Sequence, residues 1–209
     1  MPKIDAFEKY SDAYDDWFDN NRSAYEAELQ VVRQLLPAGT VRGMEIGVGS
    51  GKFAVPLGIK IGVEPSAQMA AKAKGQGVDV HSGVAEELPF LDHQFDFALM
   101  VTTICFVDDV VQAFREALRV LNPGGAIIVA YVDKASQLGQ KYLANRDKSK
   151  FYQQATFFST TEVLTHLKTA GFGSTQIKQT LITSPSDQTV LDGYGLGGFV
   201  AVKAIKEHR

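Results

Sequence analysis

Three glycines alternate along a short segment that follows the apolar run 41–46, and they are Gly47, Gly49 and Gly51. Glycine has no Cβ atom, so the backbone can turn sharply at these positions and a ligand can touch the main chain. Glu64 stands 17 residues after Gly47, at the end of the next apolar run, 59–63. A carboxylate there can accept hydrogen bonds from both hydroxyls of a ribose. The turn and the acid together predict a bound nucleoside.

The glycine turn alone has two other interpretations. It can be a tight strand-to-helix connection without a ligand, an interpretation that Glu64 weakens. It can also belong to the dinucleotide fingerprint G-x-G-x-x-G, but counting from Gly47 and Gly49 the third glycine would fall on Lys52. The sequence therefore does not match the dinucleotide fingerprint.

Taken with the segments that follow, these residues resemble the class I S-adenosylmethionine-dependent methyltransferases of the small-molecule type. The chain is similar in particular to quinone-biosynthesis C-methyltransferases, well over residues 41–132 and loosely in the flanks. The resemblance implies S-adenosylmethionine as the cofactor. It implies that Glu45 and the three glycines hold the methionine part and that Glu64 holds the ribose.

Two further segments extend this resemblance. Residues 83–90 resemble the family's Gly-x-Ala-Glu-x-Leu-Pro-Phe segment, in which the position of Ala85 and its neighbours meet the adenine edge. The residues after Glu64 match the family's usual ones, although Ser66 and Met69 also suit a helix cap and a core contact. The resemblance adds to the predicted cofactor site Pro65, Ser66, Met69, Gly83, Val84, Ala85, Glu86 and Val101.

Methyl transfer from a sulfonium acts on an already activated carbon, and orientation alone supplies effective molarities of about 10⁵–10⁸ M. The loop after the fourth predicted strand faces the methyl group in the family. Many relatives carry a histidine there, whereas this chain has Ile104, Cys105 and Phe106. We therefore expect an apolar acceptor side and name no catalytic residue. Cys105 is interpreted as a buried thiol, because the Pro-Cys pair of covalent pyrimidine methylation is absent.

Aromatic and basic residues flank the predicted cofactor region. The first helix carries the rings Tyr10, Tyr14, Trp17 and Phe18. They either close over the sulfonium or dock the helix on the sheet. The basic residues within 134–150 are interpreted as a solvated helix face rather than as a site that attracts an anionic acceptor. The aromatic pairs at 151–152 and 157–158 either wall the acceptor pocket or pack in the core.

Composition limits the partners. The net charge is −3 and no basic patch stands out, so we expect a small-molecule acceptor and no nucleic acid. The amino-terminal residues lack a signal-peptide core, and no run reaches the roughly 18 apolar residues of a membrane span. Cys105 is the single cysteine, and none of the four histidines (His81, His93, His166, His208) has a partner at metal-ligand spacing. These observations predict a cytoplasmic protein without a metal site.

The pattern of elements predicts an α/β protein with one domain over residues 1–209. Residues 2–36 read as two helices, so 1–38 form a helical lead-in or lid, and 133–160 form an insertion on the substrate side. Strands are expected at 41–46, 59–63, 78–81, 95–101 and 126–132, and a closing pair near 175–183 and 198–205. A helix is expected at 160–171, capped by Thr160 or Thr161 and ended by Gly171. The result is a Rossmann-like, seven-stranded, mostly parallel sheet with an antiparallel last strand.

These features predict an enzyme that transfers a methyl group from S-adenosylmethionine to a small, partly apolar acceptor, mainly by positioning the two reactants. Two alternatives stay open at this point, because fold alone does not fix chemistry. One is a binding module that holds the cofactor without turnover. The other is a nicotinamide-dependent oxidoreductase.

Overall fold

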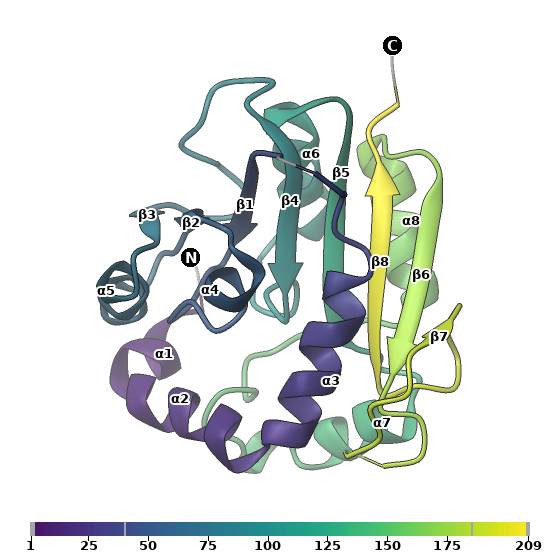
Figure 1. Ribbon diagram of the computed structural model, residues 1–209. Helices are drawn as coiled ribbons and strands as arrows, with labels where there is room; N and C mark the ends of the chain where they lie inside the picture. Colours follow the sequence, from purple (N-terminus) through teal and green to yellow (C-terminus); the bar gives the residue numbers. More distant parts are fainter. Residues whose placement is uncertain (1–2, 40, 185, 208–209) are drawn as a thin grey trace.

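One mixed sheet organises the computed structural model, which describes residues 3–39, 41–184 and 186–207; within these residues the sheet has eight strands in the order β3-β2-β1-β4-β5-β8-β6-β7. The first five strands are parallel (Figure 1). They are β1 (Gly43–Ile46), β2 (Ile61–Val63), β3 (Asp79–His81), β4 (Phe95–Val101) and β5 (Leu121–Val132). Their carboxyl ends therefore meet at one edge of the sheet, where open α/β sheets bind ligands.

The last three strands complete the sheet through antiparallel pairings. β8 (Phe199–Ile205) lies between β5 and β6 (Thr175–Thr180) and runs antiparallel to both. The predicted closing pair is thus confirmed, but the predicted total of seven strands is wrong. The additional strand is β7, which comprises only Leu191–Asp192 and pairs with β6 at the sheet edge. A strand of two exposed residues in a turn-rich connection is too short to show the alternation of apolar and polar residues by which a strand is predicted.

Helices cover both faces of the sheet. Those that follow β1, β2 and β4 are α4 (Ala54–Leu57), α5 (Ala67–Gly75) and α6 (Val110–Val120), and those that follow β5 are α7 (Gln137–Ala144), a 3-10 turn (Arg146–Lys148) and α8 (Thr160–Ala170). α6 and α8 pack side by side and bury Phe114, Val163 and Leu167 against one face. The opposite face is covered by α3 (Arg22–Arg33), which buries Val31 and Val32 in the second apolar layer. Figure 1 shows α3 and α6 on opposite sides of the central strands.

The described residues 3–38 of the amino-terminal lead-in contain three helices, so the prediction of two was wrong. α1 (Asp5–Lys9) and α2 (Ser11–Asn20) are separated at Tyr10, and α2 and α3 at Asn21, because both residues leave the helical region with φ near −126° and −122°. The Asn21 side chain also donates a hydrogen bond of 2.8 Å to the Trp17 carbonyl. Such local side-chain bonds compete with helix continuation.

Two helix and strand ends differ from expectation. α8 begins at Thr160 and its cap is Ser159, not Thr160 or Thr161 as predicted, because Ser159 and Glu162 form a reciprocal capping box. Gly171, at φ 108°, ends α8 as predicted. β5 starts at Leu121 rather than at residue 126, because Leu121 already pairs with Phe95 while Ala126 pairs with Phe97. The four residues between them form a bulge in the strand.

Candidate functional site

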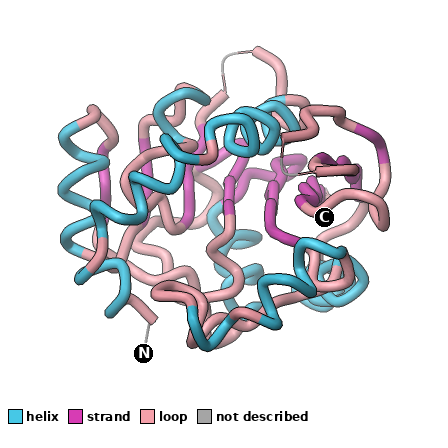
Figure 2. The backbone as a smooth tube through the Cα atoms, turned by 90° about the horizontal axis from the view of Figure 1, so that it is seen from below, coloured by secondary structure: helices cyan, strands magenta, loops and turns pink. Residues whose placement is uncertain are grey.

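A cavity of about 480 Å³ lies at the carboxyl ends of the parallel strands. Helices α1 and α2 lie beneath these ends in Figure 1, and Figure 2 views the molecule from that side. The wall comes from distant parts of the chain: the three amino-terminal helices, the turns after β1 and β2, residues 83–86, the loop after β4, α7 and residues 151–152. A volume of this size lies within the range of roughly 300–1,000 Å³ that is typical of small-molecule sites.

The glycine turn forms one wall of this cavity. Gly47, Gly49 and Gly51 have φ values of 70°, 55° and 89°, a region that residues with a Cβ rarely adopt. A Cβ atom on Gly47 would lie 2.5 Å from the Thr103 side chain. The backbone amides of Gly47 and Val48 donate to the Val63 carbonyl at 2.8 and 3.0 Å, which ties the turn to β2. The turn is therefore held rigidly against the end of β2, where Glu64 follows.

Glu64 is held in place by two backbone amides. Its Oε2 accepts a hydrogen bond of 2.9 Å from Gly49, and its Oε1 accepts one of 2.9 Å from Ser66. The carboxyl group is 8% exposed, and burial raises its pKa despite these two bonds. A carboxylate offers about four lone-pair sites, so two stay open toward the cavity. This orientation suits a pair of neighbouring hydroxyl groups.

Most of the residues predicted to bind the cofactor line the cavity. They are Gly47, Gly49, Glu64, Pro65, Met69, Gly83, Val84, Ala85, Glu86 and Val101. Gly51 and Ser66 lie behind the wall: Gly51 packs against Val55 and α5, and Ser66 caps α5 by accepting a hydrogen bond of 3.3 Å from Met69. The contribution of these two residues is to shape the turn and the helix that the other residues need.

Glu45 also lies behind the wall, 2% exposed. Burial raises its pKa well above the ordinary value, and the backbone amide of Ala54 opposes this shift by hydrogen bonding. Among the described residues, its Oε2 atom has no hydrogen-bond partner. A buried polar atom without a partner is uncommon and costs free energy. With the glycine turn and Glu64, this uncommitted oxygen fits a ligand that carries polar groups, as the methionine part and the ribose of S-adenosylmethionine do.

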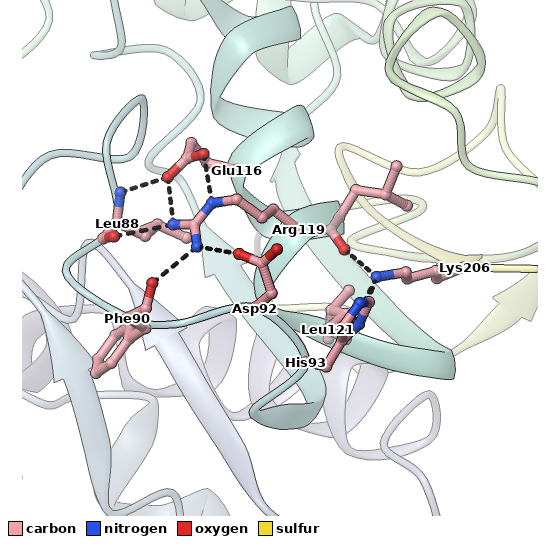
Figure 3. Close-up of polar contacts among 9 residues, drawn as sticks. Leu88, Phe90, Asp92, His93, Glu116, Arg119, Leu121 and Lys206 are labelled. Atoms are coloured by element: carbon pink, nitrogen blue, oxygen red, sulfur yellow. Dashed lines mark hydrogen bonds and ion pairs between the residues drawn. The ribbon is translucent and has the colours of Figure 1, made fainter.

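A network centred on Arg119 fixes the segment that follows residues 83–86 (Figure 3). The guanidinium donates to the carbonyls of Leu88 and Phe90 at 3.1 and 2.8 Å. It also pairs with both oxygens of Glu116 at 2.7 and 2.8 Å and with Asp92 at 2.9 Å. Glu116 in turn accepts a bond of 2.9 Å from the Leu88 amide. The wall at residues 83–86 is thus anchored to α6.

Replacing Arg119 with methionine should lower the free energy of unfolding by about 1–2 kcal/mol, because two carbonyls and two carboxylates lose a shared donor. Urea denaturation followed by circular dichroism measures this change. Arg115→Met is the matched control, since Arg115 lies one turn away on the same helix and is exposed. Equal stability of the two variants would contradict an anchoring role for Arg119.

The opposite wall of the cavity is aromatic. Phe7 of α1 contacts Tyr14, Phe106 and Phe151 with ring centroids 5.7, 5.0 and 5.5 Å apart. Tyr152 stacks on Phe106 at 5.9 Å. The lead-in helices, the loop after β4 and the segment around 151 therefore meet at this wall. Trp17, Phe151 and Tyr152 line the cavity, as the sequence allowed, whereas the second aromatic pair, 157–158, lines a separate small cavity.

The loop after β4 contributes less than expected. Phe106 lines the large cavity, but Ile104 is buried in the core and Cys105 faces the small separate cavity. The expectation that these three residues together face the ligand is therefore wrong. The Cys105 thiol donates to the Thr102 carbonyl at 2.9 Å, and burial raises its pKa to about 12. The interpretation of Cys105 as a buried thiol is confirmed. Such a group is a poor nucleophile.

Basic residues and histidines contribute little to the cavity. Within the part of the chain that the structure describes, no histidine lines it, and Lys3 is its only lysine or arginine. His208 lies outside the described residues. Lys134 pairs with Glu162 at 2.6 Å, and the Lys150 ammonium lies 5.2 Å from the centroid of the Tyr10 ring. Residues 133–160 therefore supply the wall with rings, Tyr142 among them, and not with charge.

Sequence reasoning missed Glu28 of α3. This residue is 6% exposed and lines the cavity, although its helix neighbours Ala24, Ala27, Val31 and Val32 belong to the apolar face. The sequence signal that could have found Glu28 is an acidic residue on the apolar side of an amphipathic helix. Charged residues are rarely fully buried without a partner, so such a residue stands out. Burial raises the pKa of Glu28 to about 8.

This raised pKa makes stability depend on pH. The folded protein retains the Glu28 proton at pH values where the unfolded chain, with a carboxyl pKa near 4.5, has lost it. Stability therefore falls as pH rises from about 4.5 to about 8. We expect wild type to lose stability relative to Glu28→Gln between pH 5 and 9, measured by urea denaturation of both proteins. Parallel pH profiles would contradict the raised pKa.

Comparisons with known proteins identify the family. Residues 44–129 match a family model described as a methyltransferase domain. A crystal structure of an S-adenosylmethionine-dependent methyltransferase from Thermotoga maritima, described as a possible histamine N-methyltransferase, matches with a TM-score of 0.94 and 50% identity, over 98% of this chain and 100% of that one. The chain belongs to the S-adenosylmethionine-dependent methyltransferases.

Two relatives are similar to this chain by sequence. An uncharacterized protein of Methanocaldococcus jannaschii is 43% identical to this methyltransferase over 206 residues, which are 97% of this chain and 100% of the relative. A demethylmenaquinone methyltransferase of Bacillus cytotoxicus is 27% identical over 153 residues, 65% of this chain and 64% of the relative. The resemblance to quinone-biosynthesis enzymes is thereby confirmed at low identity.

The described residues of the methyltransferase contain neither a membrane-spanning helix nor a metal-binding cluster. None of their helices combines the length and the apolar composition that crossing a membrane requires. Nor do they contain a group of three or more histidine, cysteine, aspartate or glutamate side chains placed to hold a metal ion.

Proposed function

We propose that this methyltransferase moves the methyl group of S-adenosylmethionine to a small, partly apolar acceptor and does so mainly by positioning the two reactants. One observation carries the proposal: a single cavity of about 480 Å³ joins the glycine turn and Glu64 to a wall of aromatic rings. The polar end suits a nucleoside, and the aromatic end suits an apolar molecule.

The residues divide between the two ends of the cavity. We assign the ribose to Glu64, the methionine part to the glycine turn with Glu45 behind it, and the adenine to residues 83–86. When bound, the cofactor supplies a methyl group on a positively charged sulfur. The rings of Tyr14 and Trp17 line the same cavity and suit a nearby cation, because aromatic faces attract positive charge.

Helices α1 and α2 act in this proposal as a lid that excludes water. Three polar contacts hold α2 against the cofactor end: Ser50 donates to Asp15 at 2.5 Å, and Lys72 of α5 bonds Asp12 and Asp15 at 2.6 and 2.8 Å. A closed, dry site strengthens the electrostatic and orienting contacts within it. The lid and the substrate-side segment 133–160 belong, in this proposal, to the same domain as the sheet.

The relatives support a small acceptor. The Thermotoga protein, described as a possible histamine N-methyltransferase, shares half of its residues with this chain. The net charge of −3 disfavours a nucleic acid, and the single cysteine agrees with a reducing, cytoplasmic setting.

Turnover should not depend on a histidine or on the thiol. We expect Cys105→Ser and the alanine variants of His81, His93, His166 and His208 to keep wild-type activity within about threefold, because a general base would contribute about 10²-fold or more. Release of S-adenosylhomocysteine with a panel of small acceptors measures this. A loss of about 100-fold in any one variant would contradict transfer by positioning.

Calorimetry and the product-release assay together separate the alternative functions. Titration calorimetry with S-adenosylmethionine, its demethylated product and nicotinamide dinucleotides tests which nucleotide binds. Cofactor binding without product release for any acceptor would favour a binding module, and tight binding of a nicotinamide dinucleotide alone would overturn the proposal.

A further inference from the structure

Glu28 is a buried acid that the proposed cofactor contacts do not use. It projects from α3 into the cavity wall and is 6% exposed. Within the described part of the chain, no hydrogen bond or ion pair to Glu28 is found, and burial alone shifts its pKa, whereas Glu64 accepts two backbone hydrogen bonds. A carboxyl group buried without a partner is costly to ionise. Such a group is expected where a ligand completes it.

The groups that face Glu28 are aromatic and uncharged. Four tyrosines interact with it electrostatically: Tyr14 of α2, Tyr25 of α3, Tyr142 of α7 and Tyr152. Tyr142 and Tyr152 stack on each other with ring centroids 5.4 Å apart. Among the residues that the structure describes, Lys3 is the one basic residue of the lining, and it forms no ion pair with Glu28. The surroundings of Glu28 therefore lack a protein cation but contain ring faces that attract one.

We propose that Glu28 binds a protonated amine on the methyl acceptor, with Tyr142 and Tyr152 against the carbon skeleton of that acceptor. This inference rests on the proposed function and specifies its acceptor as an amine with an apolar or aromatic body. An ammonium group would give the carboxylate a charged hydrogen-bond donor, and the rings would add cation–π attraction.

Glu28 and Glu64 come from different segments of the cavity wall, and Tyr14 interacts electrostatically with both. Glu64 lies between the glycine turn and the start of α5, whereas Glu28 comes from α3 and faces tyrosines of α7 and of the 152 region. The alternative ligand for Glu28 is the ammonium of the cofactor's own methionine part. This alternative makes a different prediction, because it requires Glu28 for cofactor binding and the proposal does not.

The test uses the full chain saturated with S-adenosylhomocysteine and matched pairs of probes. The amines are 2-phenylethylamine and histamine, and their neutral counterparts are 2-phenylethanol and 4-(2-hydroxyethyl)imidazole. We expect calorimetry to find at least one amine bound about tenfold or more tightly than its alcohol, the preference that a charge-assisted hydrogen bond provides. Glu28→Gln should abolish that preference and leave the affinity for the alcohols unchanged.

A second readout follows from the pKa of Glu28, which burial raises to about 8. An ammonium group beside the carboxyl favours its ionised form. Amine binding at pH 7 should therefore release a proton, which titrations in buffers of different ionisation enthalpy detect. The release should disappear in Glu28→Gln.

The control is Glu26→Gln, which changes the same charge on the same helix at an exposed position. It should keep the amine preference. The proposal is overturned if wild type prefers neither amine or if Glu28→Gln keeps the preference. It is also overturned if Glu28→Gln weakens the binding of S-adenosylhomocysteine by the same factor as the binding of the amine. If S-adenosylmethionine itself does not bind wild type, the proposed function fails; if it binds and neutral acceptors are methylated without an amine preference, only this inference fails.

Discussion

Replacing Gly49 with valine should lower the affinity for S-adenosylmethionine by more than about 100-fold, which corresponds to about 2.7 kcal/mol. Gly49 has a φ of 55° and lines the cavity. A Cβ atom there would lie 3.5 Å from the Met69 side chain and 3.7 Å from the Tyr14 hydroxyl, so the two further methyl groups of valine would enter the space between them. A ligand that approaches the main chain at this turn would meet them directly.

The same substitution disturbs a second contact. The Gly49 amide donates to Glu64 Oε2 at 2.9 Å, and a branched residue at positive φ favours a shift of this backbone. Both effects act on the cofactor end of the cavity and reinforce each other. Calorimetric titration of S-adenosylmethionine into wild type and variant measures the combined loss.

Gly77→Val separates the loss of binding from the cost of backbone strain. Gly77 has a φ of 87°, and a Cβ atom there would have no atom within 4 Å, so valine imposes the backbone penalty far from the cavity wall. This control should lose stability and keep cofactor affinity. If folded Gly49→Val binds as tightly as wild type, the turn serves only to connect β1 and α4.

The parallel half of the sheet was predictable because its signals are local. β4 has the bounds that its apolar run indicated, 95–101, and the other four strands of this half differ only at their ends. A buried strand, a glycine turn and a crossover helix each leave a pattern within about a dozen residues. The capping box at Ser159 is also local, but a serine followed by two threonines offers three neighbouring caps, and the reciprocal bond to Glu162 decides among them.

The end of the cavity at the glycine turn was predictable for the same reason. Gly47, Gly49 and Glu64 come from consecutive turns of one strand-helix-strand unit, so short spacings fix them together. The rest of the cavity, where we propose that the acceptor binds, could not be predicted in this way, because Phe7, Glu28, Phe106 and Tyr152 come from four separate segments. Only the packing of α1, α3 and the loops places them around one cavity. Each of these residues by itself suits an ordinary core.

The loop after β4 illustrates the same limit. Ile104, Cys105 and Phe106 are consecutive, so sequence alone treats them as one surface. In the structure the loop turns, with the Cys105 thiol bonded to the Thr102 carbonyl and the Phe106 amide to the Thr103 carbonyl at 2.9 Å each. Successive side chains of such a turn point in different directions, which sends Ile104 to the core and Phe106 to the cavity.

Replacing Glu64 with alanine should weaken the binding of S-adenosylmethionine by about 1.5–3 kcal/mol, or about 10- to 150-fold, the range for hydrogen bonds to a charged group. The structure supplies the reason for so large an effect. The amides of Gly49 and Ser66 already orient the carboxylate, so little conformational freedom remains to be lost when the ribose binds. Glu87 is exposed and lies outside the cavity lining, so Glu87→Ala removes the same charge without altering the cavity wall. This control should leave the affinity for S-adenosylmethionine unchanged.

The two backbone bonds also mean that Glu64→Ala removes structural contacts, so affinity alone does not identify the ribose as its partner. Measuring the affinity of wild type and of Glu64→Ala for S-adenosylhomocysteine and for its 2′-deoxy and 3′-deoxy analogues makes that identification. If Glu64 accepts the ribose hydroxyls, wild type should lose affinity when either hydroxyl is removed, whereas Glu64→Ala should bind all three ligands equally. Equal losses in wild type and variant would assign the ribose to other residues and leave Glu64 as a support for the glycine turn.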